Sequence, residues 1–320
     1  MPKIMFRPAP TPPPFVPPTP VAGALTFTAR EANSSVAFTI NGDVTGVSLL
    51  YSTDNGQSWN PYTFNQSVNL TAENDNVMFK GDNDSFSVDD SSFIQVVMTG
   101  KIAASGSLAY LLDSNGGNKP LTPFCFYGLF SNCTSLIQAP ALPATTLADD
   151  CYNYMFYNCT SLVQAPALPA TSLTQRCYAD MFERCTSLIQ APVLPAISLS
   201  IGCYSNMFGE CLSLAQAPAL PATSLADYCY SNMFRQCTSL IQAPALPATS
   251  LVNLCYSNMF YDCTSLNHVE CNATEISASS CLESWLSNVS ASGTFKKNAS
   301  MNDWPSGASG IPVGWTIENI

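Results

Sequence analysis

The residues best equipped for chemistry in this chain are its 14 cysteines, most of which fall in pairs eight positions apart. Zinc or disulfide bonds are the chemistry that such pairs suggest. Zinc needs four converging thiolate or imidazole ligands, commonly from C-x2-C knuckles, whereas the spacing here is C-x7-C and the only histidine is His268. Zinc is therefore disfavoured. Disulfides would need an oxidising route of export.

The pairs recur at a fixed distance along the chain. The first cysteines are 26 residues apart and are Cys125, Cys151, Cys177, Cys203, Cys229 and Cys255. A constant period of this size predicts a repeat architecture in which equivalent residues stack into columns. We expect the cysteines to be reduced packing residues, because free cysteine is among the most buried residue types. The predicted structural core comprises Cys151, Phe156, Cys159, Leu162, Phe182, Cys185, Phe234 and Cys237.

Each repeat reads C-Y-x-x-M-F-x-x-C-T-S-L-I-Q-A-P-A-L-P-A-T-S-L-x-x-x. Its tyrosine, phenylalanine and second cysteine are spaced i, i+4 and i+7, which predicts one face of a short helix. The Ser-Leu-Ile-Gln-Ala stretch predicts a short strand that the following proline ends. We expect the proline-rich stretch to be extended without a ladder of hydrogen bonds. One such unit cannot bury its own apolar side, so the units must stack.

The motif CYxxMFxxCTSLxxAPxLPATxL resembles the BspA-like leucine-rich repeats of bacterial cell surfaces, of some parasites and of tailed phages of gut bacteria, most closely over residues 125–266. The resemblance implies adhesion or display and supplies no catalytic residues. The predicted fold is an α/β solenoid of BspA-like leucine-rich repeats of 26 residues, preceded by a small all-β domain of the Ig-like or sandwich type.

Four regions follow from these patterns. Residues 1–21 form a Pro-rich extended anchor or linker, in which Met5, Phe6, Phe15 and Val16 are candidate anchor residues. Residues 22–120 form the β domain, residues 121–280 the solenoid and residues 281–320 a C-terminal capping segment. Alternating apolar residues predict strands at 24–29, 35–40, 47–52, 76–81 and 93–98. The expected cap residues are Trp304, Ile311, Pro312, Trp315 and Ile317.

Two smaller motifs in the β domain have structural explanations. Residues 52–59, STDNGQSW, match the Asp-box pattern of hairpins in sialidases and other carbohydrate-handling proteins. A hairpin in which Asp54 bonds the turn is favoured over a ligand site. The acidic residues Asp82, Asp84, Asp89 and Asp90 lack the order of a calcium-binding loop, so a solvated loop is expected.

Composition narrows the function. Only 10% of the residues are charged and the net charge is −11, which disfavours nucleic acid and anionic membranes as partners. No apolar stretch reaches the length of a membrane helix, and the N-terminal residues do not have the pattern of a secretory signal. Glu270 lies near His268, but this pair is more typical of a degenerate last repeat than of an active site. We expect a protein without enzymatic activity, metal or cofactor.

The repeats vary most at their seventh and eighth positions and at their last three. These columns are expected to face solvent, so they are where a partner would be recognised. The candidate binding surface comprises Tyr157, Glu183, Arg184, Arg235 and Tyr261.

Three functions stay open at this point. The first is a virion structural protein, a phage head or tail fibre or decoration that binds a host surface protein or glycan. The second is a bacterial cell-surface BspA-like adhesin, and the third is an intracellular binding scaffold. Attachment to other virion proteins through the N-terminal segment, and assembly as a homo-oligomer (dimer or trimer), are expected for the first.

Overall fold

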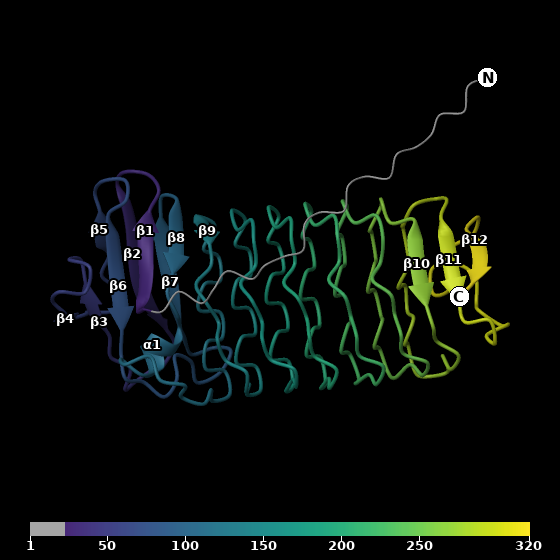
Figure 1. The fold of residues 1–320 in the computed structure, drawn as a ribbon, viewed down its shortest axis with the longest axis horizontal. Helices are drawn as coiled ribbons and strands as arrows, with labels where there is room; N and C mark the ends of the chain where they lie inside the picture. The colour runs from purple at the N-terminus through teal and green to yellow at the C-terminus, as the bar shows by residue number, and fades with distance from the viewer. Residues whose placement is uncertain (1–22) are drawn as a thin grey trace, which may run out of the picture.

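The protein is elongated, with a β-rich body at its N-terminal end and a long row of layers that continues to its C-terminal end (Figure 1). The computed structural model describes residues 23–320, so the anchor residues Met5, Phe6, Phe15 and Val16 lie outside the described part. The strands are β1 (Leu25–Ala29), β2 (Ser34–Asn41), β3 (Leu50–Ser52), β4 (Asn60–Pro61), β5 (Val68–Leu70), β6 (Asn76–Lys80), β7 (Phe93–Thr99), β8 (Ile102–Ser105), β9 (Leu136–Gln138), β10 (His268–Cys271), β11 (Thr294–Lys297) and β12 (Thr316–Asn319). The helix α1 (Ala109–Leu112) follows β8.

The β body consists of two facing sheets. One has the order β4-β3-β6-β1-β8-β9 and the other the order β5-β2-β7. Alternation buries every second residue of β1, among them Phe27, which meets Phe38 of the other sheet edge to face at 6.2 Å. Phe79 packs on Phe38 at 4.8 Å. The five strands expected from alternation are confirmed as β1, β2, β3, β6 and β7.

The body and the layers share one core. The strand β8 pairs in parallel with β9, which belongs to the first repeat. Phe27 of the body lies 6.1 Å from Phe130 of that repeat, and the Val96 N–H donates to the Leu129 carbonyl over 2.7 Å. The first repeat therefore stacks on the end of the β body, and residues of both sheets cover its apolar side.

Each 26-residue repeat forms one layer, named here by its first cysteine. Along the chain, backbone amides alternate between donating a hydrogen bond to the next layer and donating one within their own layer. The Tyr152 and Phe156 amides donate to carbonyls of the next layer, over 3.1 and 2.9 Å, whereas the Met155 and Cys159 amides donate to the carbonyl three residues before them. The layers are thus joined by ordinary backbone hydrogen bonds while the chain within each layer keeps turning.

The turning comes from residues in the left-handed region at every fourth position. In the Cys151 layer these are Asp150, Tyr154 and Asn158, with φ between 54° and 57°. The same three columns keep positive φ in the repeats from Phe124 to Asn288. A left-handed residue interrupts the bonding of a right-handed helix, so each repeat is a run of linked turns.

The prediction of an α/β solenoid is therefore wrong. Helix accounts for 1% of the structure and strand for 22%, and within residues 23–320 the only α-helix is the four-residue α1. The i, i+4, i+7 spacing that indicated a helix reflects a four-residue turn period instead, which brings Tyr152, Phe156 and Cys159 to the same buried side. A period of four is close to the 3.6 residues of a helix, and the two are easily confused over eight residues.

One strand per repeat was also expected, and this is wrong for the middle layers. There the described chain has only isolated parallel bridges, such as Gln164 with Gln190. The strand β10 forms where NHVECN replaces IQAPAL and so removes its proline. β10 pairs with β11, and β11 pairs with β12. Because proline lacks an amide hydrogen, its repetition in the middle layers prevents a continuous ladder.

The C-terminal segment covers the last layer with large aromatic residues. Trp285 is fully buried, stacked between Tyr256 at 6.2 Å and Trp304 at 5.9 Å. Trp315 and Ile311 are buried too, whereas Pro312 is half-buried. Ile317 does not join this cap, because it lies on the exposed edge strand β12 and is 52% exposed.

Candidate binding surface

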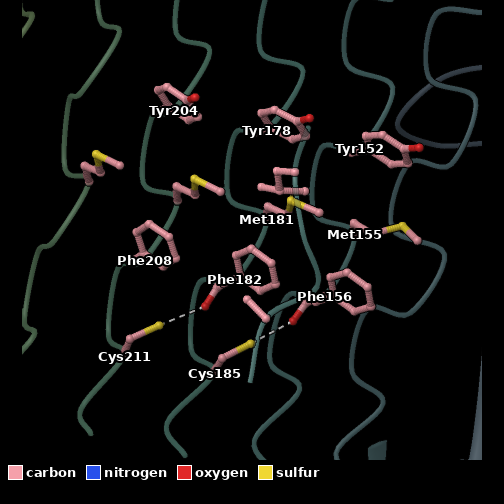
Figure 2. Packing of buried hydrophobic residues seen from close by; sticks show 14 of the residues in the cluster. Tyr152, Met155, Phe156, Tyr178, Met181, Phe182, Cys185, Tyr204, Phe208 and Cys211 are labelled. Carbon is pink, nitrogen blue, oxygen red and sulfur yellow. Dashed lines mark hydrogen bonds between the residues drawn. The ribbon is translucent and has the colours of Figure 1, made fainter. Parts of the chain in front are cut away.

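The interior of the layers consists of columns of identical side chains (Figure 2). Phe182 stacks between Phe156 at 5.5 Å and Phe208 at 5.7 Å, with nearly parallel rings. Tyr178 stacks in the same way between Tyr152 and Tyr204, at 6.0 Å from each. The eight predicted core residues, Cys151, Phe156, Cys159, Leu162, Phe182, Cys185, Phe234 and Cys237, are each 0% exposed. This column packing fixes the positions of the outward-facing residues.

The two cysteine columns have different surroundings. All 14 cysteines are buried and free. In every pair after the first, the second cysteine donates its thiol hydrogen to the carbonyl of the previous layer's phenylalanine, as Cys185 does to Phe156 and Cys211 to Phe182, each over 3.1 Å (Figure 2). In the first pair Cys133 donates to the Val96 carbonyl of the β body. Burial raises the pKa of the Cys185 thiol to about 12. In residues 23–320 no group of three or more His, Cys, Asp or Glu residues is arranged to hold a metal ion.

The polar residues of the two motifs in the β body form local contacts with neighbouring residues. Asp54 accepts from the Ser52 hydroxyl over 2.6 Å and from the Ser58 amide over 2.9 Å, and these bonds lower its pKa to about 2. The Asp-box residues therefore build the turn between β3 and β4, as expected. Of the acidic run, Asp84 pairs with Lys119 at 2.6 Å, and Asp89 accepts from the Ser91 amide over 2.9 Å.

His268 and Glu270 both lie on β10, two residues apart, so their side chains share one face of the strand. Both are half-buried. Their position in the one proline-free repeat motif agrees with a role in forming the terminal sheet.

Four of the five candidate binding residues meet in one ionic network across neighbouring layers. The Arg184 guanidinium donates to the Glu210 carboxylate over 3.1 Å and to the Tyr157 hydroxyl over 2.8 Å. Arg235 donates to the other Glu210 oxygen over 2.7 Å and lies 3.8 Å from the Glu183 carboxylate. Glu210 thus accepts hydrogen bonds from both arginines. Through these contacts four of the candidates are linked, namely Tyr157, Glu183, Arg184 and Arg235. Tyr261 is half-buried and lies further along the row of layers.

Glu183 departs from the expected exposure. Its column was predicted to face solvent, but Glu183 is buried, with 7% of its surface exposed. Burial raises its pKa, and the nearby carboxylate of Glu210 raises it further. Asn206, Arg184 and Arg235 favour the charged form of Glu183, and the Arg235 side chain is only 30% exposed. Arg184 is the more accessible of the two arginines, at 47%.

Sequence reasoning missed Asp180, which lies beside this network. It accepts from the Asn206 side-chain amide over 2.9 Å, and burial raises its pKa to about 7. Asp180 occupies a left-handed position with a φ of 55°. The signal that could have revealed it is the frequency of Asn, Asp and Gly at every fourth residue, which these backbone positions favour.

The eighth column also links layers to one another. The Asn158 amide donates to the Asn132 side chain over 2.9 Å, and Asn288 donates to Asp262 over 2.7 Å. The residues of this column therefore vary in complementary pairs. Part of the variation that suggested a recognition surface is thus explained by contacts between neighbouring repeats.

Comparisons with protein-family models, with curated proteins and with solved structures found no match. Within residues 23–320, no helix has the length and apolar character needed to cross a membrane.

Proposed function

We propose that this protein is a non-enzymatic virion structural protein, a phage head or tail fibre or decoration, that displays its layers to bind a host surface protein or glycan. The observation that supports this most is the contrast between its core and its outer columns. The same tyrosine, methionine, phenylalanine and cysteine recur inside, whereas the seventh and eighth positions change from layer to layer. Such a row offers an extended, preorganised surface for recognition.

The surface proposed for recognition is the outward side of the ionic network. Tyr157 and Arg184 are its accessible members: the Arg184 guanidinium lies 5.7 Å from the centre of the Tyr157 ring. An arginine held over an aromatic ring loses little further freedom on binding, and it keeps donors for a carboxylate or a hydroxyl. The resemblance of the repeat motif to BspA-like repeats, which implies adhesion or display, supports the same function.

Attachment to other virion proteins is proposed to use residues 1–21, with the protein in the virion as a dimer or trimer. The anchor residues lie outside the described part, so this step is based on the sequence. The alternative is a bacterial cell-surface adhesin, which the same layered display supports.

Two measurements test this proposal. A chain lacking residues 2–20 should be made by the host but be absent from purified particles, whereas the full chain should be present. If the shortened chain is incorporated at the normal stoichiometry, the anchor is not this segment. If the full chain is found on bacterial cells and never in particles, the adhesin alternative replaces the virion proposal.

The recognition surface is tested by substituting Arg184→Gln, with Arg30→Gln in the β body as the matched loss of an exposed arginine. Binding to host cells should weaken for the first variant and not for the second. Equal binding by both variants, together with loss of binding on changes in residues 22–120, would move recognition to the β body.

A further inference from the structure

A groove opens between two layers on the proline-bearing side. It has a volume of about 520 Å³ and is lined by Ala215–Ala219 of the Cys203 layer and Ile241–Ala245 of the Cys229 layer. Its walls are alanine, proline, isoleucine and two glutamines, with no charged side chain. A ligand for such walls is uncharged and largely apolar.

The backbone pairing between layers lapses at this groove. Elsewhere in this segment the Cys177 layer is joined to the Cys151 layer, by the Ile189 amide to the Val163 carbonyl over 3.1 Å, and the Cys255 layer to the Cys229 layer, by the Asn267 amide to the Ile241 carbonyl over 3.0 Å. Between the Cys177 and Cys203 layers the described segment has no such bond. Within the described chain no backbone hydrogen bond joins Ala215–Ala219 to Ile241–Ala245. The carbonyls of Ala215–Ala219 therefore accept no backbone hydrogen bond from the Cys229 layer, and the non-proline amides of an extended peptide can donate to them.

Apolar side chains are exposed next to the groove, in the Cys177 layer. Val193, Ile197 and Ile201 are 59%, 66% and 50% exposed, and they stand where the other four proline-bearing repeats have alanine, threonine and a polar residue, respectively. Pro218 in the groove is half-exposed, whereas the equivalent Pro244 is buried. Additional exposed apolar side chains in one layer, at places where neighbouring layers have small or polar residues, indicate an interaction site.

The chain enters the described structure in line with this groove. The Gly23 carbonyl accepts from the Ser107 amide over 3.1 Å, and Ser107 bridges Ala141. Ala141 has the same place in its repeat as Ala219 of the groove, because the two are three times 26 residues apart. From Gly23 to Ala219 there are thus five strand or layer steps, which span about 24 Å at roughly 4.8 Å each.

We propose that this groove binds the N-terminal segment of the same chain, with Phe15 and Val16 as the residues it holds. Phe15 precedes Gly23 by eight residues, and at about 3.1 Å per residue a polyproline chain of that length spans about 25 Å, which matches the distance to Ala219. Residues 8–20 are uncharged and apolar, as the groove is. The contact does not require attachment to particles. It would be released when the segment binds another protein.

Hydrogen exchange in the full chain tests this placement. The amides of Ala215–Ala219 and Ile241–Ala245 should exchange at least tenfold faster in the double variant Phe15→Ser, Val16→Ser than in the wild type. Phe6→Ser is the matched control, because Phe6 lies nine residues beyond Phe15 and past the groove. Equal exchange in the wild type and the double variant would overturn the proposal, as would an equal effect of Phe6→Ser.

A synthetic peptide of residues 8–20 tests the chemistry of the groove in the same double variant. The peptide should bind saturably, and adding Ile241→Asp should weaken binding at least tenfold. Val163→Asp is the control, since Val163 is an exposed residue at the same place in a layer that does not line the groove. Failure of the peptide to bind, or equal weakening by both aspartates, would refute the groove as its site.

Concentration distinguishes the same chain from a second copy. Protection of the groove amides should not change when the full chain is diluted one hundredfold. Protection that disappears together with a dimer on dilution would refute binding within one chain. Neither assay contains particles, so its outcome is separate from the test of the proposed function.

Discussion

Because each repeat is a run of linked turns, we predict that glycine stabilises the protein more than alanine does at position 236, which is occupied by Gln236. This residue has a φ of 61°, is half-buried and donates to the Asp262 carboxylate over 3.3 Å. Two variants, Gln236→Gly and Gln236→Ala, lose that hydrogen bond equally. The difference between them therefore isolates the preference of the backbone at this position.

The sign of that difference distinguishes a helix from a run of linked turns at this position. In the interior of a helix, alanine is more stable than glycine by about 1 kcal/mol. At a left-handed position the Cβ atom of alanine costs about 1–2 kcal/mol, which glycine avoids. From the observed φ we expect Gln236→Gly to be more stable than Gln236→Ala by about 1 kcal/mol, a swing of about 2 kcal/mol from the helical expectation.

Urea unfolding followed by tyrosine and tryptophan fluorescence measures this difference. The transition midpoint should be higher for the glycine variant, with an unchanged slope. A useful internal reference is Gly202, where the chain itself has glycine in the left-handed region, with a φ of 59°. Gly202→Ala should destabilise the protein by a similar amount. If Gln236→Ala proves the more stable variant, the repeat is helical at this position and the turn structure is wrong.

Three further results are expected. Phe182→Ala should lower the free energy of unfolding by about 3–5 kcal/mol, because the ring is 0% exposed and lies between two other rings. The control is Ile189→Ala, which should cost less than about 1 kcal/mol because that side chain is 58% exposed, and similar losses for both variants would contradict the packing. Thiol titration should find few reactive groups in the native protein and close to 14 after denaturation. Burial raises the pKa of thiols such as Cys203 to about 12, so the free energy that they contribute to folding should be fully present below pH 9 and decline as the pH rises towards 12. Burial raises the pKa of Asp180 from 3.8 to about 7. Asp180→Asn should therefore nearly match the wild type in stability at pH 4 and exceed it by about 4 kcal/mol at pH 8, and no gain at pH 8 would show that the carboxyl is well solvated.

The ionic network shows how structure changes the reading of a variable residue. From the sequence, Arg184 and Arg235 are equivalent surface charges whose loss should hardly affect stability. The structure distinguishes them, because Arg235 forms the ion pair with the buried carboxylate of Glu183, at 3.8 Å, and its own side chain is less exposed than that of Arg184. We therefore expect Arg235→Gln to destabilise the protein more than Arg184→Gln. Thermal unfolding of the two variants measures this, and equal melting temperatures would contradict it.

The sequence by itself determined the period of the layers, the residues of their core and the strands of the β body. Phe182 and Cys185 are identifiable as core residues because an apolar residue repeated every 26 positions must stack on its own copies. The alternation in β1 and β2 is equally direct, since a strand with one buried face shows its period of two in the residues themselves.

Only the tertiary structure decided how the chain turns within a layer and where the layers separate. The i, i+4, i+7 spacing is compatible with a helix and with four-residue turns, and the choice depends on hydrogen bonds to residues 25 positions away, such as Phe156 to Met181. A left-handed residue costs about 1–2 kcal/mol when considered alone. The bonds and ring stacking between layers offset that cost, and because they join residues distant in the sequence, local patterns do not reveal them.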